Sequence, residues 1–254
     1  MLETEPSGGF VAAFVALVAV MATGFVAALY KARLAEDGDG AAARRWGIWG
    51  AAAVTLWLGI TGGLAGAGLL HFGPVPPPIM IVFVCMLTLI FTVSFSRVGT
   101  VLSQQLPLWF LVGFQAFRIP VELLLHRAYS EGLMPVEMSY EGWNFDVVSG
   151  VTGLLVGGAL LAVGNKVPQR LLWAWNVLGF ALLLTIITIA NLATPFFGVI
   201  KGDPPNVWIT HLPFVWLPTV HVVLAFIGHL LVFRRLSHER AKSRTILPAH
   251  AEAT

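Results

Sequence analysis

The sequence predicts an all-α, polytopic membrane helix bundle, and two observations carry this prediction. First, 57% of the 254 residues are hydrophobic and only 11% are charged, whereas a soluble domain carries about 25% charged residues. Second, seven apolar stretches approach the length of about 20 residues that a helix needs to cross the hydrocarbon layer. Helices are favoured because open strands would leave backbone groups unpaired in lipid.

The seven expected transmembrane helices leave little of the chain outside the bilayer. In chain order they cover Phe10–Tyr30, Trp46–Leu70, Pro78–Ser96, Leu106–His126, Phe145–Val163, Leu171–Ala193 and Leu212–Phe233. The fourth is the least apolar, because it contains Gln115, Arg118 and Glu122. We expect residues 1–236 to form a single membrane domain and residues 237–254 to form a flexible cytoplasmic tail.

The distribution of Lys and Arg predicts the orientation. Twelve of these residues lie in the links after the first, third and fifth stretches or after the seventh, and only Arg127 and Lys201 lie in links on the other side. Cytoplasmic loops are the ones enriched in Lys and Arg. The N-terminus is therefore expected outside and the C-terminus in the cytoplasm, which requires an odd number of crossings. An acidic start, with Glu3 and Glu5, is unlike the positive beginning of a cleavable signal peptide.

Composition also limits the expected partners. The net charge is only +2, and no basic stripe interleaved with aromatics is present, so we expect a lipid bilayer and no nucleic acid. The single cysteine, Cys85, excludes a disulfide framework within the chain. Gly59 with Gly63, and Gly62 with Gly66, give two small-residue pairs of the kind that let membrane helices pack closely. They suit packing inside the bundle, or against a second copy or a membrane protein partner.

Polar residues gather on one face of the fourth stretch. Gln115, Arg118, Glu122 and His126 fall at i, i+3, i+7 and i+11. Charged side chains within a membrane span nearly always face the bundle interior or a water-filled cavity. We expect Arg118 and Glu122 to form an i, i+4 ion pair, and Asp146 to reach Arg118 from the next stretch. This cluster either orders the helices or forms a pre-organised polar site.

Two long links lie on the predicted outer side, His126–Phe145 and Thr194–His211. Both contain aromatic residues and prolines, and we expect them to pack over the helix ends as a lid. Asn144 and Asp146 suit helix capping, although capping does not explain both of them together with Glu141. A polar pocket near the outer leaflet is the alternative interpretation.

The histidines raise the question of a metal or haem cofactor. Three of them lie at the outer ends of expected spans, namely His71, His126 and His211. Together with Glu122 they could make a metal site. His221 and His229 are eight residues apart and point about 80° away from each other around a helix. One haem iron is not expected to bind both, and each is expected to hydrogen-bond a neighbouring helix.

Several short motifs in the second half of the chain recur together. They are FRIPVE at Phe117–Glu122, MSYEGWNFD at Met138–Asp146, WNVLG at Trp175–Gly179, PPNVW at Pro204–Trp208, PFVWLP at Pro213–Pro218, and His229. This set, over Phe117–Leu236, resembles an uncharacterised family of bacterial multi-pass membrane proteins. The resemblance implies a bacterial cytoplasmic (inner) membrane and a shared polar centre. The residues implied for that centre are Arg118, Glu122, Glu141, Asn144, Asp146, Asn176 and His229.

Three functions are compatible with this pattern. The first is binding or transport of a small anionic or lipid-like ligand at an outer-leaflet pocket, with Arg118 pairing an anionic group. The second is a membrane-embedded enzyme that uses a metal, or carboxylates as acid and base. The third is an accessory or scaffold subunit of a membrane complex. The sequence contains no catalytic signature that decides among them.

Overall fold

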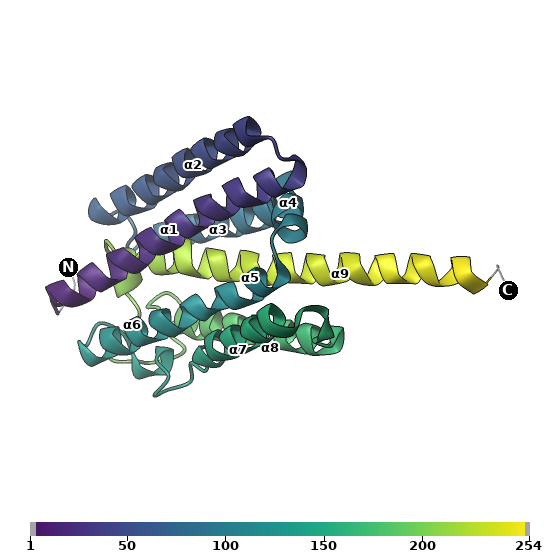
Figure 1. The fold of residues 1–254 in the computed structure, drawn as a ribbon. Helices are drawn as coiled ribbons and strands as arrows, with labels where there is room; N and C mark the ends of the chain where they lie inside the picture. The colour runs from purple at the N-terminus through teal and green to yellow at the C-terminus, as the bar shows by residue number, and fades with distance from the viewer. Residues whose placement is uncertain (1–3, 252–254) are drawn as a thin grey trace.

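The computed structural model describes residues 4–251, and this part of the chain is a bundle of helices without β-strands. Helix α9, Val223–Ala251, runs through the middle of the bundle (Figure 1). Helices α1 to α4 lie on one side of α9 in this view, and α5 to α8 lie on the other. Within the described residues, six helices are long and apolar enough to cross a membrane, and a seventh apolar helix is shorter. The predicted fold class is confirmed.

The first two helices form an antiparallel hairpin. Helix α1 covers Gly8–Asp37 and helix α2 covers Gly40–Gly66. The Ser7 side chain caps the start of α1. Gly38 ends α1 with φ +75°, in the left-handed region that favours glycine, and the Asp39 carboxylate then caps the start of α2. The turn is therefore encoded in two consecutive residues, Gly38 and Asp39.

The third helix is followed at once by a helix that the sequence analysis did not expect. Helix α3 covers Pro78–Phe95 and α4 covers Arg97–Gln105. Ser96 between them is extended, and its hydroxyl accepts a hydrogen bond from the backbone N–H two residues later, at the first turn of α4. Arg234 of α9 also donates a hydrogen bond to the Ser94 carbonyl at the end of α3. The link after the third span is thus ordered by its capping residue and by α9.

The fourth predicted span is continuous but changes its pitch. Helix α5 covers Leu108–Gly113, a 3₁₀ turn (η1) covers Phe114–Phe117, and α6 covers Arg118–Ser130. Pro120 has no N–H and leaves the Ala116 carbonyl without its i+4 donor. The tighter turn directly precedes Arg118, and mid-helix 3₁₀ segments often mark functional or strained positions.

Helix α7, Val147–Val163, packs very closely on the α5–η1 segment. A Cβ added at Gly157 would lie 2.6 Å from the Gly113 Cα, so only glycine allows this approach. After a 3₁₀ turn at Gly164–Lys166 (η3), α8 covers Gln169–Leu192. At 17 residues, α7 is the shorter apolar helix, and a count of seven crossings is not confirmed by length.

Short turns lie in the two long links and lead into the last helix. The turns η2, Val136–Met138, and η4, Trp208–Thr210, lie in the two long links, and each link contributes buried apolar side chains. The last predicted span begins with a π-helical turn (η5) at Leu217–Val222 and continues as α9 over Val223–Ala251. Residues 237–251 are thus helical in the structure, and the predicted flexibility of 237–254 stays a prediction.

The two small-residue pairs of α2 have different surroundings. Gly62 packs on Trp216 and Leu212, so that an added Cβ would lie 3.0 Å from the Trp216 ring. Gly59 and Gly63 face away from the bundle, with nothing near an added Cβ. Internal packing therefore accounts for the pair Gly62 and Gly66, whereas the pair Gly59 and Gly63 has no packing contact within the bundle.

Candidate functional site

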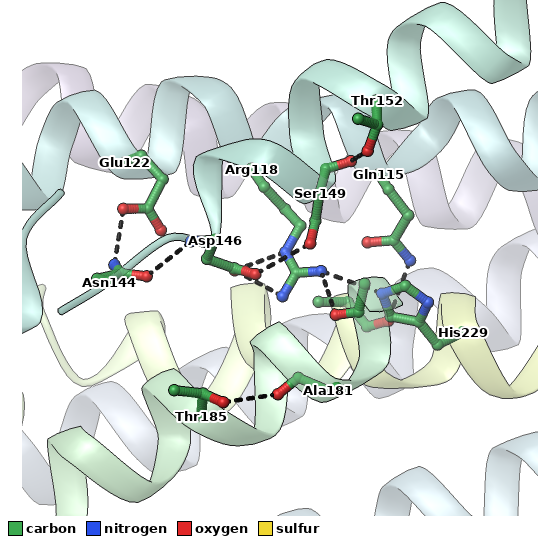
Figure 2. Close-up of polar contacts among 12 residues, drawn as sticks. Gln115, Arg118, Glu122, Asn144, Asp146, Ser149, Thr152, Ala181, Thr185 and His229 are labelled. Atoms are coloured by element: carbon green, nitrogen blue, oxygen red, sulfur yellow. Dashed lines mark hydrogen bonds and ion pairs between the residues drawn. The ribbon is translucent and has the colours of Figure 1, made fainter. Parts of the chain in front are cut away.

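The centre of the site is a buried ion pair between α6 and the start of α7. Arg118 is only 2% exposed. Its Nε donates to Asp146 Oδ2 at 2.7 Å, and its Nη2 lies 2.5 Å from the same oxygen (Figure 2). The predicted contact between Arg118 and Asp146 is confirmed. The predicted ion pair between Arg118 and Glu122 is wrong, because the guanidinium points to α7, α8 and α9 instead.

The other edge of the guanidinium contacts α8 and α9. Arg118 Nη1 donates to the Gly179 carbonyl at 3.3 Å and lies 3.0 Å from His229 Nε2. Because a guanidinium only donates, Nε2 must accept, and the His229 proton is on Nδ1. Nδ1 lies 2.8 Å from Asn176 Oδ1, and the Asn176 amide donates to the His229 carbonyl at 3.1 Å. His229 is thus neutral and hydrogen-bonds a neighbouring helix, as predicted.

Close packing at α8 makes this geometry possible. A Cβ added at Gly179 would lie 2.7 Å from His229 Cε1. Any other residue there would displace the imidazole from Arg118. Gln115, three residues before Arg118, donates from Nε2 to the Ala225 carbonyl of α9 at 3.1 Å. The polar groups of the fourth span therefore join α6, α7, α8 and α9.

Glu122 forms a separate branch of the network. Asn144 Nδ2 donates to Glu122 Oε2 at 2.7 Å and to the Met138 carbonyl at 3.0 Å. Glu122 is 1% exposed, and among the described residues no Lys, Arg or His comes within ion-pair distance of it. A buried carboxyl that is held only by an amide is costly unless a partner or a proton joins it.

Capping does not explain the start of α7. Asp146 lies at the N-cap position, but its side chain caps no backbone N–H. Its carboxylate instead binds Arg118 and accepts from the Ser149 hydroxyl at 3.3 Å. The Asn144 side-chain oxygen, Oδ1, accepts a hydrogen bond from the Asp146 backbone N–H at 3.0 Å. Asn144 therefore connects the Glu122 branch to the ion pair.

A cavity of about 640 Å³ lies beside this network. Its walls come from α3, α6, α8, η5 and α9, and most of the lining side chains are apolar. The polar lining residues are Arg118, Glu122, Asp146, Asn191, Thr194, Asn206 and His221. Val84, Leu87 and Phe91 of α3 and Leu184 of α8 line the cavity and are also exposed on the outside of the bundle. The cavity is thus open laterally between α3 and α8.

His221 lies on the π-helical turn and lines this cavity. It is 2% exposed, it packs edge-on against Phe14 and stacks on Phe117, and neither ring nitrogen has a hydrogen-bond partner. The prediction that His221 hydrogen-bonds a neighbouring helix is wrong. π-Helical turns are rare and frequently occur at functional sites.

Asn206 from the second outer link also lines the cavity. Its side-chain nitrogen, Nδ2, donates to the Ala190 carbonyl at 2.8 Å, but its side-chain oxygen, Oδ1, is buried without a hydrogen-bond partner. The sequence analysis did not single out Asn206. The available signals were its place in the PPNVW motif and in a link rich in prolines and aromatics, and both are equally typical of a turn.

A second cavity, of about 560 Å³, lies between α2 and α9 and provides a contrast. The residues that line it include no ionisable side chain. Two tryptophans join the surrounding helices: Trp57 of α2 donates to the Thr219 carbonyl, and Trp216 donates to the Leu58 carbonyl. Only the first cavity combines apolar walls with buried charged groups.

The outer histidines are dispersed. His126 stacks on Tyr140 with its Nδ1 3.5 Å from Glu141 Oε1, so Glu141 lies outside the Arg118 network. His211 contacts Thr210, and burial lowers the pKa of His211. His71 contacts the Gly68 carbonyl. Across residues 4–251, no three His, Cys, Asp or Glu side chains come together as a metal site requires. The structure thus offers no shared site for the three predicted metal ligands, and the haem alternative is untested.

Comparison with known proteins identifies a family. The model of a domain of unknown function, DUF8737, matches residues 76–237, which is more than half of the chain, and the chain belongs to this family. The match includes the Arg118 network and the 640 Å³ cavity but excludes α1 and α2. No curated protein and no solved structure matches the chain.

Proposed function

We propose that this membrane protein binds a lipid-like molecule in the cavity between α3 and α8. The observation that carries the proposal is the form of this cavity. It has apolar walls, it opens to the side of the bundle, and it contains buried polar groups. Its volume of about 640 Å³ is within the range of about 300–1,000 Å³ for small-molecule sites. Apolar chains would lie along the walls and a head group would lie near Glu122 and His221.

The lateral opening supports entry from the membrane. A lipid-like molecule is dissolved in the bilayer and can reach an opening between two helices without crossing water. The exposed lining residues on both sides of this opening are apolar. A water-soluble solute would have to pass these apolar side chains, which removes it from water at a cost. The site therefore suits a ligand that arrives from lipid, for binding or for transport across the bilayer.

The arrangement in the membrane is part of the proposal. We infer seven crossings with the N-terminus outside, in a bacterial cytoplasmic membrane. Helix α7, with its 17 residues, is about 25 Å long at 1.5 Å per residue, and a bilayer accommodates a shortfall of a few Å at modest cost. Twelve Lys and Arg residues on one side against two on the other support this orientation. Arg118 then lies near the middle of the bundle, with Glu122 and Asp146 toward the outer side and Asn176 and His229 toward the cytoplasmic side.

Arg118 has a supporting role in this proposal. Its Nε and Nη1 groups are engaged by Asp146, Gly179 and His229, so the guanidinium is held rigidly rather than offered to a ligand. Arg118 Nη2 also lacks a hydrogen-bond partner but is ion-paired with Asp146, whereas both ring nitrogens of His221 and the side-chain oxygen of Asn206 have no protein partner. An anionic ligand at Arg118 would have to displace Asp146.

Blocking the cavity tests the proposed function. Ala190 of α8 lines the cavity, whereas Ala181 on the same helix is exposed and does not. We expect native mass spectrometry of purified wild-type protein, loaded with monolauroylglycerol, to show one bound molecule. Ala190→Trp should lose most of this binding and Ala181→Trp should retain it, with both variants monodisperse. Equal binding by the two variants would falsify the assignment to this cavity. Wild-type protein that binds no lipid and co-purifies with a stoichiometric protein partner would favour an accessory subunit.

A further inference from the structure

We infer that the head group bound at this site is uncharged and carries a hydroxyl, and that His221 recognises it. This inference rests on the proposed function and specifies its ligand. It follows from two independent features of the cavity, its charge balance and its unpartnered polar atoms.

The charge balance disfavours an anionic head group. Three lining residues carry formal charges, and they are Arg118, Glu122 and Asp146. Arg118 is paired with Asp146 at 2.5 Å, and Glu122 has only an amide donor. No cation is left for a phosphate or carboxylate, and an anion would lie close to an unpaired carboxyl group. A carboxylate at Glu122 would repel the anion, and a protonated Glu122 would leave the anion without a countercharge in a poorly solvated site.

A cationic head group is also a poor match. It could approach Glu122, but an ammonium group only donates hydrogen bonds. Neutral His221 offers one ring nitrogen that donates and one that accepts, and both are unsatisfied. An ammonium group would satisfy the accepting nitrogen alone and would lose its own hydration in a largely apolar cavity.

A hydroxyl matches the unpartnered atoms. It can accept from the protonated nitrogen of His221, or it can donate its single proton either to the other nitrogen or to the buried side-chain oxygen of Asn206. Leaving buried polar atoms unpaired is costly, so a group that pairs them gains affinity. His221 is held in place by Phe14, which it meets edge-on, and by Phe117, on which it stacks. The glycerol of an acylglycerol and the terminal hydroxyl of a polyprenol share this chemistry.

The test uses one substitution, one control variant and four single-chain probes. His221→Phe keeps the ring and its packing and breaks no hydrogen bond in the protein. His238→Phe, on an exposed position further along α9, is the control. Binding of monolauroylglycerol, farnesol, dodecyl phosphate and dodecylammonium is measured by competition in native mass spectrometry, with thermal unfolding as the check on folding.

We expect wild-type protein to bind one or both hydroxyl probes at least tenfold more tightly than either charged probe. The two hydroxyl probes differ in their chains, so their ranking separates an acylglycerol from a polyprenol. His221→Phe should weaken the hydroxyl probes about tenfold and leave the charged probes unchanged, and His238→Phe should match wild type.

Other outcomes overturn the inference in different ways. Preference for a charged probe contradicts the charge argument. If the folded His221→Phe variant binds all four probes as tightly as wild type does, the His221 imidazole is hydrogen-bonded by water and does not contact the head group. In both cases the proposed function survives if Ala190→Trp still blocks binding. If no probe binds to wild-type protein, the inference and the proposed function fail together.

Discussion

Helices α2 and α9 have nearly the same hydropathy but very different surroundings. Their most apolar windows have mean hydropathies of 1.5 and 1.7, yet 17% of the α2 window is buried and 78% of the α9 window. Trp49 of α2 is 73% exposed, whereas His229 of α9 is fully buried. Apolar composition therefore brings a helix into the membrane without deciding its place in the bundle. Polar side chains are concentrated where protein surrounds them, as the cost of polar groups in lipid requires.

Removing the buried charge should have the largest effect. Arg118→Met leaves the Asp146 carboxylate buried with only the Ser149 hydroxyl as a side-chain donor. We expect a loss of about 3–5 kcal/mol in the free energy of unfolding, the usual cost of an orphaned buried charge. Arg44→Met, at an exposed position of α2, should change it by less than about 0.5 kcal/mol. Unfolding by SDS in mixed micelles, followed by circular dichroism, provides the measurement.

A second substitution separates charge from packing. If the cost of Arg118→Met comes from the orphaned carboxylate, the double variant Arg118→Met with Asp146→Leu should recover part of the lost stability. Additive losses in the double variant would mean that the shape of the network, rather than its charge, holds α6 to α7.

Two adjacent glycines of α7 allow the effect of a substitution at a buried position to be compared with its effect at a lipid-facing position of the same helix. A Cβ at Gly157 would meet the Gly113 backbone, whereas nothing lies near a Cβ at Gly158. Gly157→Ala should cost about 1–3 kcal/mol through overpacking. Gly158→Ala should be neutral or stabilise by up to about 1 kcal/mol, because alanine favours helix more than glycine does. The same SDS titration compares the two, and equal effects would mean that α7 does not pack on α5 at this point.

The attachment of α2 to the rest of the bundle should be weak and local. Trp57→Phe removes the hydrogen bond to the Thr219 carbonyl, and we expect a loss of about 0.6 kcal/mol, the average for polar contacts between membrane helices. Trp49→Phe, at an exposed position on the same helix, should have no measurable effect. A loss of more than about 2 kcal/mol for Trp57→Phe would show that α2 is a more integral part of the bundle than its exposure indicates.

The smallest expected effect depends on pH, at a contact outside the membrane spans. Burial tends to raise the pKa of Glu131, but hydrogen bonds from the Ser7 N–H and hydroxyl and from Arg127 outweigh it and lower this pKa. A lowered pKa in the folded state means that the stabilisation is present above the unfolded-state value, about 4.3, and is lost as the pH falls through the folded-state value. Wild-type protein should therefore lose slightly more thermal stability between pH 7 and pH 3.5 than Glu131→Gln. An identical acid-induced loss in the two proteins would exclude this contact as a contributor.

The site could be predicted from the sequence in part. The helical spacing placed Gln115, Arg118 and Glu122 on one face, and all three are buried. The choice of partner could not be predicted, because Arg118 turns to Asp146 rather than to Glu122 on its own helix. That choice depends on how closely α7 packs on α5 and α8 packs on α9, which Gly157 and Gly179 allow through contacts between distant segments.

The residues that line the cavity were the least predictable. A histidine without a hydrogen bond looks the same in a sequence as one that has a partner, and His221 and His229 differ only in what lies opposite them. Glu141 was grouped with the network by motif resemblance, but the loop places it beside His126 on the outer surface. Side-chain environment is a property of the neighbours, and the neighbours come from other helices.

The sequence by itself determined that this chain is a helical membrane protein, since composition and stretch length decide whether a segment can cross a bilayer. It also determined that a few ionisable residues would be buried together, because lipid does not solvate them. Only the tertiary structure decided which helix became the centre of the bundle, which charges paired, and where a laterally open cavity remained. These outcomes depend on shape complementarity between distant segments, which no local pattern encodes.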